Sequence, residues 1–89
     1  GAFWEFSMLS NGGAFIWPDM LETSLQMFNP HNGNEAELSP EAAGIAVCLM
    51  VYSIWSFKTE SAVLVEYFYQ LRDYAMQHPK QAQIFHLID

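Results

Sequence analysis

The stretch that says most about the fold reads FWEFSMLSNGGAFIWP and spans residues 3–18. Asn11-Gly12 lies between two aromatic-rich runs, and this arrangement is the strongest short-range sign of a β-hairpin. A two-residue turn at this dipeptide pairs Leu9 with Ala14 and fixes the register of the residues on either side. The sequence therefore predicts an N-terminal hairpin whose tip is Asn11-Gly12.

In this register one face of the predicted hairpin is almost entirely aromatic. Side chains alternate between the two faces along a strand, so the face carries Trp4, Phe6, Met8, Phe15 and Trp17. The opposite face carries Phe3, Glu5, Ser7, Leu9, Ala14 and Ile16. A large apolar surface of this kind needs a cover, and we expect helices from later in the chain to provide it.

A second hairpin is predicted between the first one and the helices. Alternation of apolar and polar side chains favours a strand within residues 21–28. Residues 29–34 form a dense cluster of turn-forming residues that contains Asn32-Gly33. The chain then returns through residues 35–38.

The sequence Ser39-Pro40-Glu41 predicts the start of a long helix. Serine accepts hydrogen bonds from free amides, proline loses nothing at the first helical position, and glutamate suits the positive end of the helix dipole. The helix should run to about Phe57, and because it is apolar on all sides we expect it to be the central buried helix. The uncharged run of residues 42–57 is shorter than the ~20 residues of a membrane span, which favours a core helix over a membrane segment.

Two further helices follow. Residues 59–61 begin the second, which ends at His78-Pro79, because the residue before proline avoids helical angles. Pro79 can open a last short helix that carries Ile84, Phe85 and Ile88. Strands followed by helices predict an α+β fold: a small antiparallel sheet, made of the N-terminal hairpin and one or two short strands, covered on one face by three C-terminal helices. We expect residues 1–89 to form a single domain.

The charge of the chain argues against binding to nucleic acid. The chain has ten acidic residues and only three basic ones, Lys58, Arg72 and Lys80, so its formal net charge is −7. Binding to DNA or RNA by counterion release requires clustered lysine or arginine, and the sequence has no such cluster. The single cysteine, Cys48, cannot form an internal disulfide, which is typical of a cytoplasmic protein.

Two groups of residues could carry chemistry. His31, Glu35 and Glu37 lie near the second turn, where an imidazole and carboxylates could hold a metal ion for a small hydrolase. Cys48 could be a nucleophile with His78 or His86 as its base. Since turns are polar by nature and Cys48 lies in the most apolar helix, we expect no metal, no cofactor and no catalytic residue.

Partner contacts are the remaining candidate for function. The second predicted helix has an outward face with Glu66 and Asp73 beside Tyr69, a residue type that tolerates partial exposure. Asp89 lies at the negative end of the last helix, where a carboxylate is mildly unfavourable. A residue that costs stability without evident compensation is a candidate for function, so these four residues are the predicted partner contacts.

Several blocks of the chain together resemble a known family, the ArdB/KlcA antirestriction family of plasmids, prophages and islands. The blocks, in chain order, are Phe3-Trp4-Glu5-Phe6, Leu9-Ser10-Asn11-Gly12-Gly13, Phe15, Trp17-Pro18, Glu37-Leu38-Ser39-Pro40-Glu41-Ala42-Ala43-Gly44-Ile45, Tyr69-Gln70-Leu71-Arg72-Asp73-Tyr74-Ala75, His78-Pro79 and Ile88-Asp89. The resemblance covers the whole chain, which looks like the C-terminal portion of a family member.

The resemblance implies protection of incoming DNA from type I restriction enzymes without catalysis, and a compact α+β domain. It implies a protein partner, which could be the type I restriction-modification machinery. Ten scattered acids cannot reproduce the charge density of duplex DNA, about one charge per ~1.7 Å, so imitation of DNA is not expected. A small metal-dependent hydrolase and a purely structural docking domain are the alternatives, and the sequence leaves the oligomeric state open.

Overall fold

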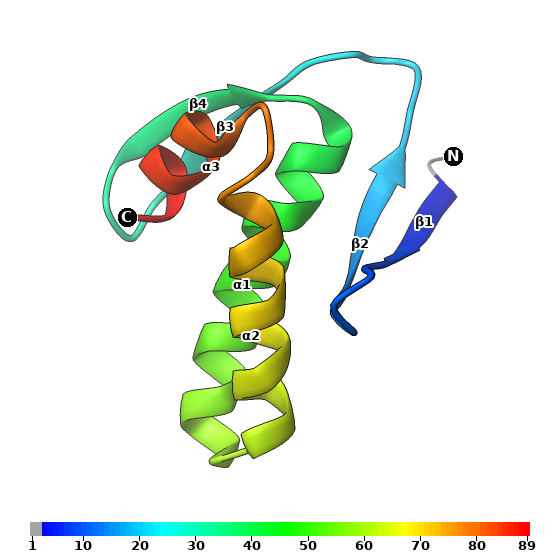
Figure 1. Cartoon of the computed structure of the whole chain (residues 1–89). Helices are drawn as coiled ribbons and strands as arrows, with labels where there is room; N and C mark the ends of the chain where they lie inside the picture. Colours follow the sequence, from blue (N-terminus) through cyan, green and yellow to red (C-terminus); the bar gives the residue numbers. More distant parts are fainter. Residues whose placement is uncertain (1–2) are drawn as a thin grey trace.

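The computed structural model describes residues 3–89 and contains four strands followed by three helices (Figure 1). The strands are β1 (Phe3–Met8), β2 (Ala14–Asp19), β3 (Leu25–Asn29) and β4 (Asn34–Leu38). The helices are α1 (Pro40–Thr59), α2 (Ala62–Ala75) and α3 (Gln81–Ile88). The predicted α+β class is confirmed.

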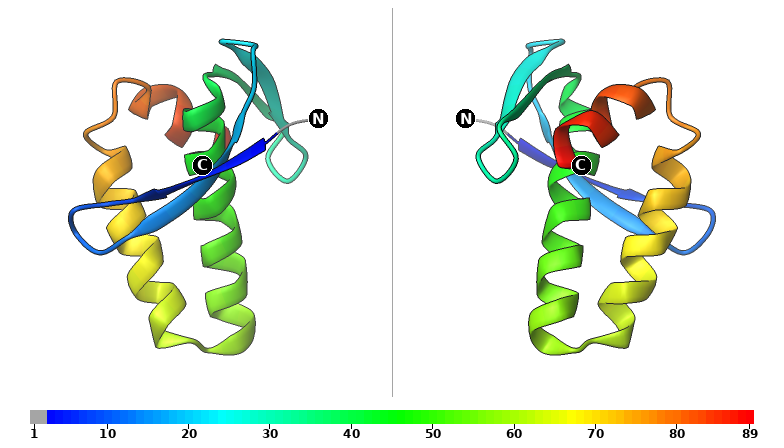
Figure 2. Two further views of the ribbon diagram at one scale, coloured as in Figure 1. Left: turned by 90° about the vertical axis from the view of Figure 1, so that its right-hand side faces the viewer. Right: turned by 90° about the vertical axis from the view of Figure 1, so that its left-hand side faces the viewer.

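The strands form two separate antiparallel hairpins, β1–β2 and β3–β4, each a two-stranded sheet. Helix α1 contacts both of them, and it also packs against α2 and α3. Figure 2 shows the β1–β2 hairpin crossing the antiparallel pair α1–α2, while α3 lies beside the β3–β4 hairpin. The core therefore lies around the first half of α1, where all these elements meet.

The first hairpin closes through a three-residue loop, so the two-residue turn predicted for it is wrong. The Leu9 N–H donates to the Gly13 carbonyl at 2.8 Å, and Met8 then pairs with Ala14. Gly12 has φ +93°, in the left-handed region that favours glycine. A tight turn followed by a left-handed glycine is the usual form of three-residue hairpin loops.

The added loop residue shifts the register by one position, and a shift of one residue exchanges the faces of one strand. One face carries Trp4, Phe6, Met8, Ala14, Ile16 and Pro18. The other face carries Phe3, Glu5, Ser7, Phe15, Trp17 and Asp19. The predicted aromatic face is therefore wrong: Phe15 is buried, whereas Trp4 and Phe6, on the other face, are 66% and 65% exposed.

Strand β2 presents its outer edge to α1 rather than to a third strand. The Tyr52 hydroxyl donates to the Ala14 carbonyl at 2.6 Å, and the Cys48 thiol lies 3.7 Å from the Ile16 carbonyl. Gly44 lies where β2 crosses the helix, and a Cβ there would be 2.5 Å from the Ile16 carbonyl oxygen. Only glycine permits so close an approach.

Helix α1 begins as predicted but is buried for only half of its length. The Ser39 hydroxyl accepts from the Ala42 N–H at 3.2 Å, with Pro40 in the first turn, which confirms the predicted cap. The buried residues of α1 all lie between Pro40 and Leu49. Beyond them Trp55 and Phe57 are exposed, so the expectation of a helix buried throughout is wrong. By length and composition alone α1 could cross a membrane, yet its first half forms the core.

Helix α2 begins after a left-handed residue, Glu60, and is capped by Ser61, whose hydroxyl accepts from the Leu64 N–H at 3.2 Å. Its buried side chains, Leu71 and Ala75, lie in the half near the core. The α1–α2 pair therefore extends as a helical hairpin past the sheets, with its tip away from the core (Figure 2).

The turn between β3 and β4 caps the end of α3. The side-chain amides of Asn29 and Asn32 both donate to the Leu87 carbonyl, at 2.9 and 3.0 Å. The Asn34 amide donates to the His86 carbonyl at 2.8 Å. Three asparagines thus satisfy carbonyl groups that the last turn of a helix leaves without partners. The turn-forming cluster of the sequence therefore serves a tertiary contact as well as the turn.

Gly44→Ala tests the close crossing of α1 and β2. Alanine stabilises an ordinary helix by roughly 1 kcal/mol relative to glycine. At this crossing the added methyl group overlaps β2, and we expect a net loss of about 1–3 kcal/mol in the free energy of unfolding, measured by urea titration. Ser53→Ala, at an exposed position of the same helix, is the control and should change stability by less than ~0.5 kcal/mol. A stabilised Gly44→Ala variant would contradict this packing.

The contacts of β2 with α1 predict a loss of stability at alkaline pH. Burial raises the pKa of the Cys48 thiol above 9.0, and burial followed by the nearby Cys48 charge raises the pKa of the Tyr52 hydroxyl above 10.0. The folded state therefore keeps protons that the unfolded chain releases, so the free energy of unfolding falls as pH rises above 9.0. Tyr52→Phe should cost about 0.5–1.5 kcal/mol near neutral pH and make the alkaline decline shallower. Urea titrations of both proteins across this pH range measure the two slopes.

Candidate functional site

The three residues weighed as a possible metal site, His31, Glu35 and Glu37, do not converge on a common point. Glu35 and Glu37 lie on the solvent side of β4, and Glu37 accepts a hydrogen bond from the Ser24 hydroxyl. His31 lies in the turn, where its backbone N–H donates to the Asn29 side chain at 3.0 Å. Among residues 3–89, no three His, Cys, Asp or Glu side chains are placed to share a metal ion.

Cys48 is buried, as predicted, and its thiol contacts a backbone carbonyl rather than a histidine. It is 8% exposed, and burial raises the pKa of the thiol, which disfavours the nucleophilic thiolate. His78, one of the two bases considered for Cys48, is instead hydrogen-bonded to Glu41, with 3.0 Å between His78 Nε2 and Glu41 Oε1. The alternative in which His78 serves as a base for Cys48 therefore has no support from this contact.

The Glu41–His78 pair joins the start of α1 to the end of α2. His78 Nδ1 accepts from the Lys80 N–H at 3.0 Å, so the proton of the neutral ring lies on Nε2 and is donated to Glu41. The Tyr74 ring packs edge-on against His78, and burial together with the Glu41 charge raises the pKa of its hydroxyl. Glu41, His78 and Tyr74 therefore hold the two helices together, and they are only partly accessible to solvent.

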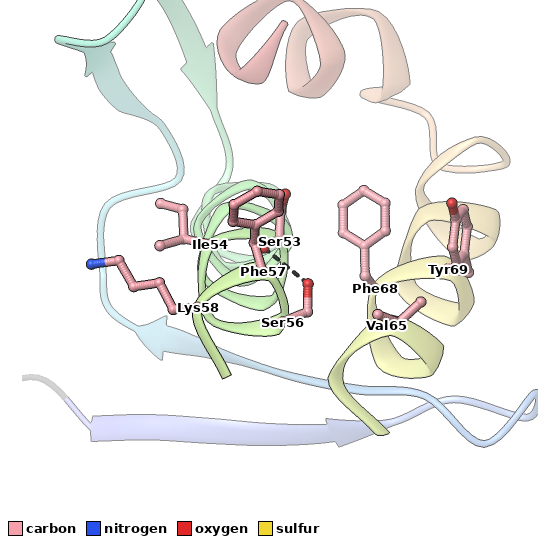
Figure 3. A pocket seen from close by; sticks show the side chains of 8 residues that line it. All are labelled: Ser53, Ile54, Ser56, Phe57, Lys58, Val65, Phe68 and Tyr69. Atoms are coloured by element: carbon pink, nitrogen blue, oxygen red, sulfur yellow. Dashed lines mark hydrogen bonds between the residues drawn. The ribbon is translucent and has the colours of Figure 1, made fainter. Parts of the chain in front are cut away.

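A concave feature follows the seam between α1 and α2 and continues toward the β3–β4 turn and the end of α3, and we call it the seam groove. It consists of two adjoining hollows of about 450 and 440 Å³, which share Ser53, Ile54 and Phe68. Figure 3 shows Phe68 of α2 projecting into the space between the helices and Phe57 projecting from α1; both side chains line the first hollow. About half of the side chains that line the groove are apolar, and the rest are polar or charged. A long groove of this mixed kind is suited to a protein segment.

The structure brings two of the four predicted contact residues to the seam groove. Tyr69 lines one hollow, with its ring edge-on to Phe68 at 5.3 Å, and Asp89 lines the other beside His31. Glu66 lies instead in a small hollow next to the tip of the first hairpin. Asp73 is exposed on α2 and lines neither part of the groove. The four residues are therefore not one cluster.

The sequence interpretation missed most of the apolar lining of the seam groove. Ile54 and Phe57 belong to the helix that was expected to be buried on all sides, and the sequence pattern did not single out Val65, because helical spacing alone does not distinguish a core face from an exposed one. The signal that could have found them is the length of the apolar helix, which exceeds what a small sheet can cover.

Residues from different family blocks contact one another where two elements of the fold pack together. The Asn11 amide donates to the Gln70 carbonyl, and the Gln70 amide donates back to the Asn11 carbonyl, each at 2.9 Å. This pair fixes the tip of the first hairpin to α2. Gly44 against Trp17 is a second such contact, and Glu41–His78 is a third.

The comparisons with known proteins agree with this interpretation of the blocks. The family model described as "Antirestriction protein" matches residues 1–89. The chain belongs to the antirestriction protein family. It is 50% identical over 90 residues to the uncharacterized protein YfjX of Escherichia coli K12 and 36% identical over 93 residues to the antirestriction protein KlcA of Escherichia coli.

The fold of this antirestriction family member has a solved counterpart. A structure from a study of KlcA and ArdB matches the whole chain with a TM-score of 0.86 at 32% identity. That study describes KlcA and ArdB as having a novel fold, and antirestriction activity against type I systems in vivo but not in vitro. The matches cover all of this chain but 59% of YfjX and 65% of KlcA, so the chain spans about three fifths of the length of these relatives.

The surroundings of Cys48 predict slow modification of its thiol. In the native protein we expect an aromatic disulfide reagent to label Cys48 at least about tenfold more slowly than in urea, because the thiol is covered and its pKa is raised. Absorbance of the released thiolate measures both rates. Equal rates in the native and unfolded protein would show that the site is open.

Proposed function

We propose that this chain is a non-enzymatic antirestriction protein that protects incoming plasmid or phage DNA from type I restriction enzymes in the cytoplasm. The observation that supports this most is the family match over residues 1–89 together with the likeness to the KlcA and ArdB fold. We take the 89 residues as one domain that corresponds to the C-terminal portion of longer relatives.

Protein contacts, rather than DNA contacts, are the proposed mechanism. Lys58, Arg72 and Lys80 lie on α1, on α2 and before α3, so they form no continuous basic surface, and the formal net charge is −7. DNA would be repelled by such a chain. Activity in vivo but not in vitro, described for KlcA and ArdB, is also what dependence on a further cellular component would produce.

The proposed contact surface comprises the seam groove and the neighbouring outward face of α2. Tyr69 offers a half-exposed ring, and Asp89 and Glu66 offer carboxylates at the two sides of this surface. Aromatic side chains beside charged rims are typical of protein interfaces. No catalytic residue or cofactor is part of the proposal.

A transfer assay in cells tests the function. We expect a family-length protein carrying this sequence to raise the survival of unmodified phage in cells with a type I restriction system and to have no effect in cells without one. The triple variant Glu66→Gln, Asp73→Asn, Asp89→Asn should lose protection, while its unfolding curve changes by less than about 1 kcal/mol because exposed charges contribute little.

A second triple variant separates the surface from the net charge. Glu22→Gln, Glu35→Gln and Glu60→Gln remove three exposed acids elsewhere, and this protein should protect like the wild type. Full protection by the first variant would exclude the contact surface. An absence of protection by the wild-type protein against any type I system would exclude the function and leave a structural docking domain as the explanation.

A further inference from the structure

We propose that the open edge of β1 binds a β-strand of a protein partner in which apolar residues alternate with basic ones. The strand would extend the β1–β2 sheet by one member, which is a common mode of peptide recognition. This surface is distinct from the seam groove, and the proposal does not depend on the antirestriction function.

The hydrogen-bonding pattern defines which backbone groups the edge offers. In an antiparallel pair, successive residues point their N–H and C=O groups alternately toward the partner strand and away from it. The Leu9 backbone is hydrogen-bonded to Gly13 across the hairpin. The residues whose backbone N–H and C=O groups point away from β2 are therefore Trp4, Phe6 and Met8. Among residues 3–89 no other strand pairs with this edge, and Figure 1 shows β1 as the outermost strand of its sheet.

The opposite edge of the hairpin is blocked, which makes the β1 edge the available one. On β2 the corresponding carbonyls of Ala14 and Ile16 face Tyr52 and Cys48 of α1. The third outward position of β2 is Pro18, which has no N–H to donate. A strand can therefore join this sheet only beside β1.

The side chains beside the open edge call for apolar residues on one face of the partner strand. Trp4, Phe6 and Met8 are 66%, 65% and 76% exposed and lie on the same face of the hairpin. Trp4 and Phe6 also line a hollow of about 430 Å³, together with Leu25 and Met27 of β3. An exposed apolar face of this kind on an edge strand is the usual mark of an interaction site.

The other face of the same hairpin favours a basic residue in the partner strand. Glu5 lies at the centre of β1, flanked on this face by Phe3 and Ser7, whereas Asp19 lies on β2 and is separated from the open edge by β1. Both carboxylates are exposed, and among residues 3–89 no lysine or arginine forms an ion pair with them. A strand paired with β1 places every second side chain on this face, and a lysine or arginine opposite Glu5 is complementary to its charge. The open edge, the apolar face and the Glu5 carboxylate thus specify one kind of occupant.

A direct binding experiment tests the proposal. The probe is a synthetic peptide of about eight residues that alternates lysine and valine, and the matched control peptide alternates glutamate and valine. Proton–nitrogen NMR spectra of the 89-residue chain report the binding of each peptide. We expect the lysine peptide alone to slow hydrogen exchange at the amides of Trp4, Phe6 and Met8, by about tenfold at saturation.

Paired variants separate the backbone contribution from the side chains. Phe6→Pro and Phe6→Val both remove the ring, but only proline removes the outward N–H. We expect the proline variant to bind the lysine peptide about three- to tenfold more weakly than the valine variant. Glu5→Gln should weaken binding by about twofold, and Glu35→Gln on β4 should have no effect. Circular dichroism confirms that each variant is folded.

Three outcomes would overturn the proposal. Equal binding by the proline and valine variants would show that the edge is not used. Equal binding of the two peptides would remove the charge argument. Protection of the three amides without peptide, together with a concentration-dependent dimer in sedimentation, would assign the edge to a second copy of the chain.

Discussion

The crossing of α1 over the outer edge of β2 is the contact on which the rest of the structure depends. Gly44 allows the helix to approach the Ile16 carbonyl, and Tyr52 and Cys48 then occupy the edge that a third strand would otherwise take. Because an edge blocked by a helix cannot extend, the strands remain in two hairpins instead of one larger sheet. The helix in turn holds α2 and α3 against its first half.

The residues in the family blocks of this protein hold elements of the fold together and do not form a catalytic site. Asn11 and Gln70 exchange hydrogen bonds between the hairpin tip and α2, and Glu41 and His78 join the ends of two helices. These side chains are engaged with one another, which leaves little for a substrate. The seam groove and the outer face of β1 take no part in these contacts, and both expose large apolar side chains. This distribution suits a protein that acts by contact.

A large exposed apolar area accompanies this arrangement. Phe3, Met8 and Phe57 are each at least 76% exposed, although single domains seldom leave side chains of this size uncovered in groups. The relatives are longer, and this chain covers 59% to 67% of their lengths. Surface that is exposed in these 89 residues is therefore available to further protein segments or to partners.

The sequence by itself determined the local elements and the family. The serine cap and proline at the start of α1, the turn residues of both hairpins and the α+β order all depend on neighbouring residues, so they could be predicted. Tertiary structure decided the register of the first hairpin and the burial of α1. One extra loop residue places Phe15 and Trp4 on opposite faces, because alternation makes the face depend on an exact count. Which half of an apolar helix is covered depends on how far the neighbouring elements extend along it. That distance cannot be read from the local sequence pattern of the helix.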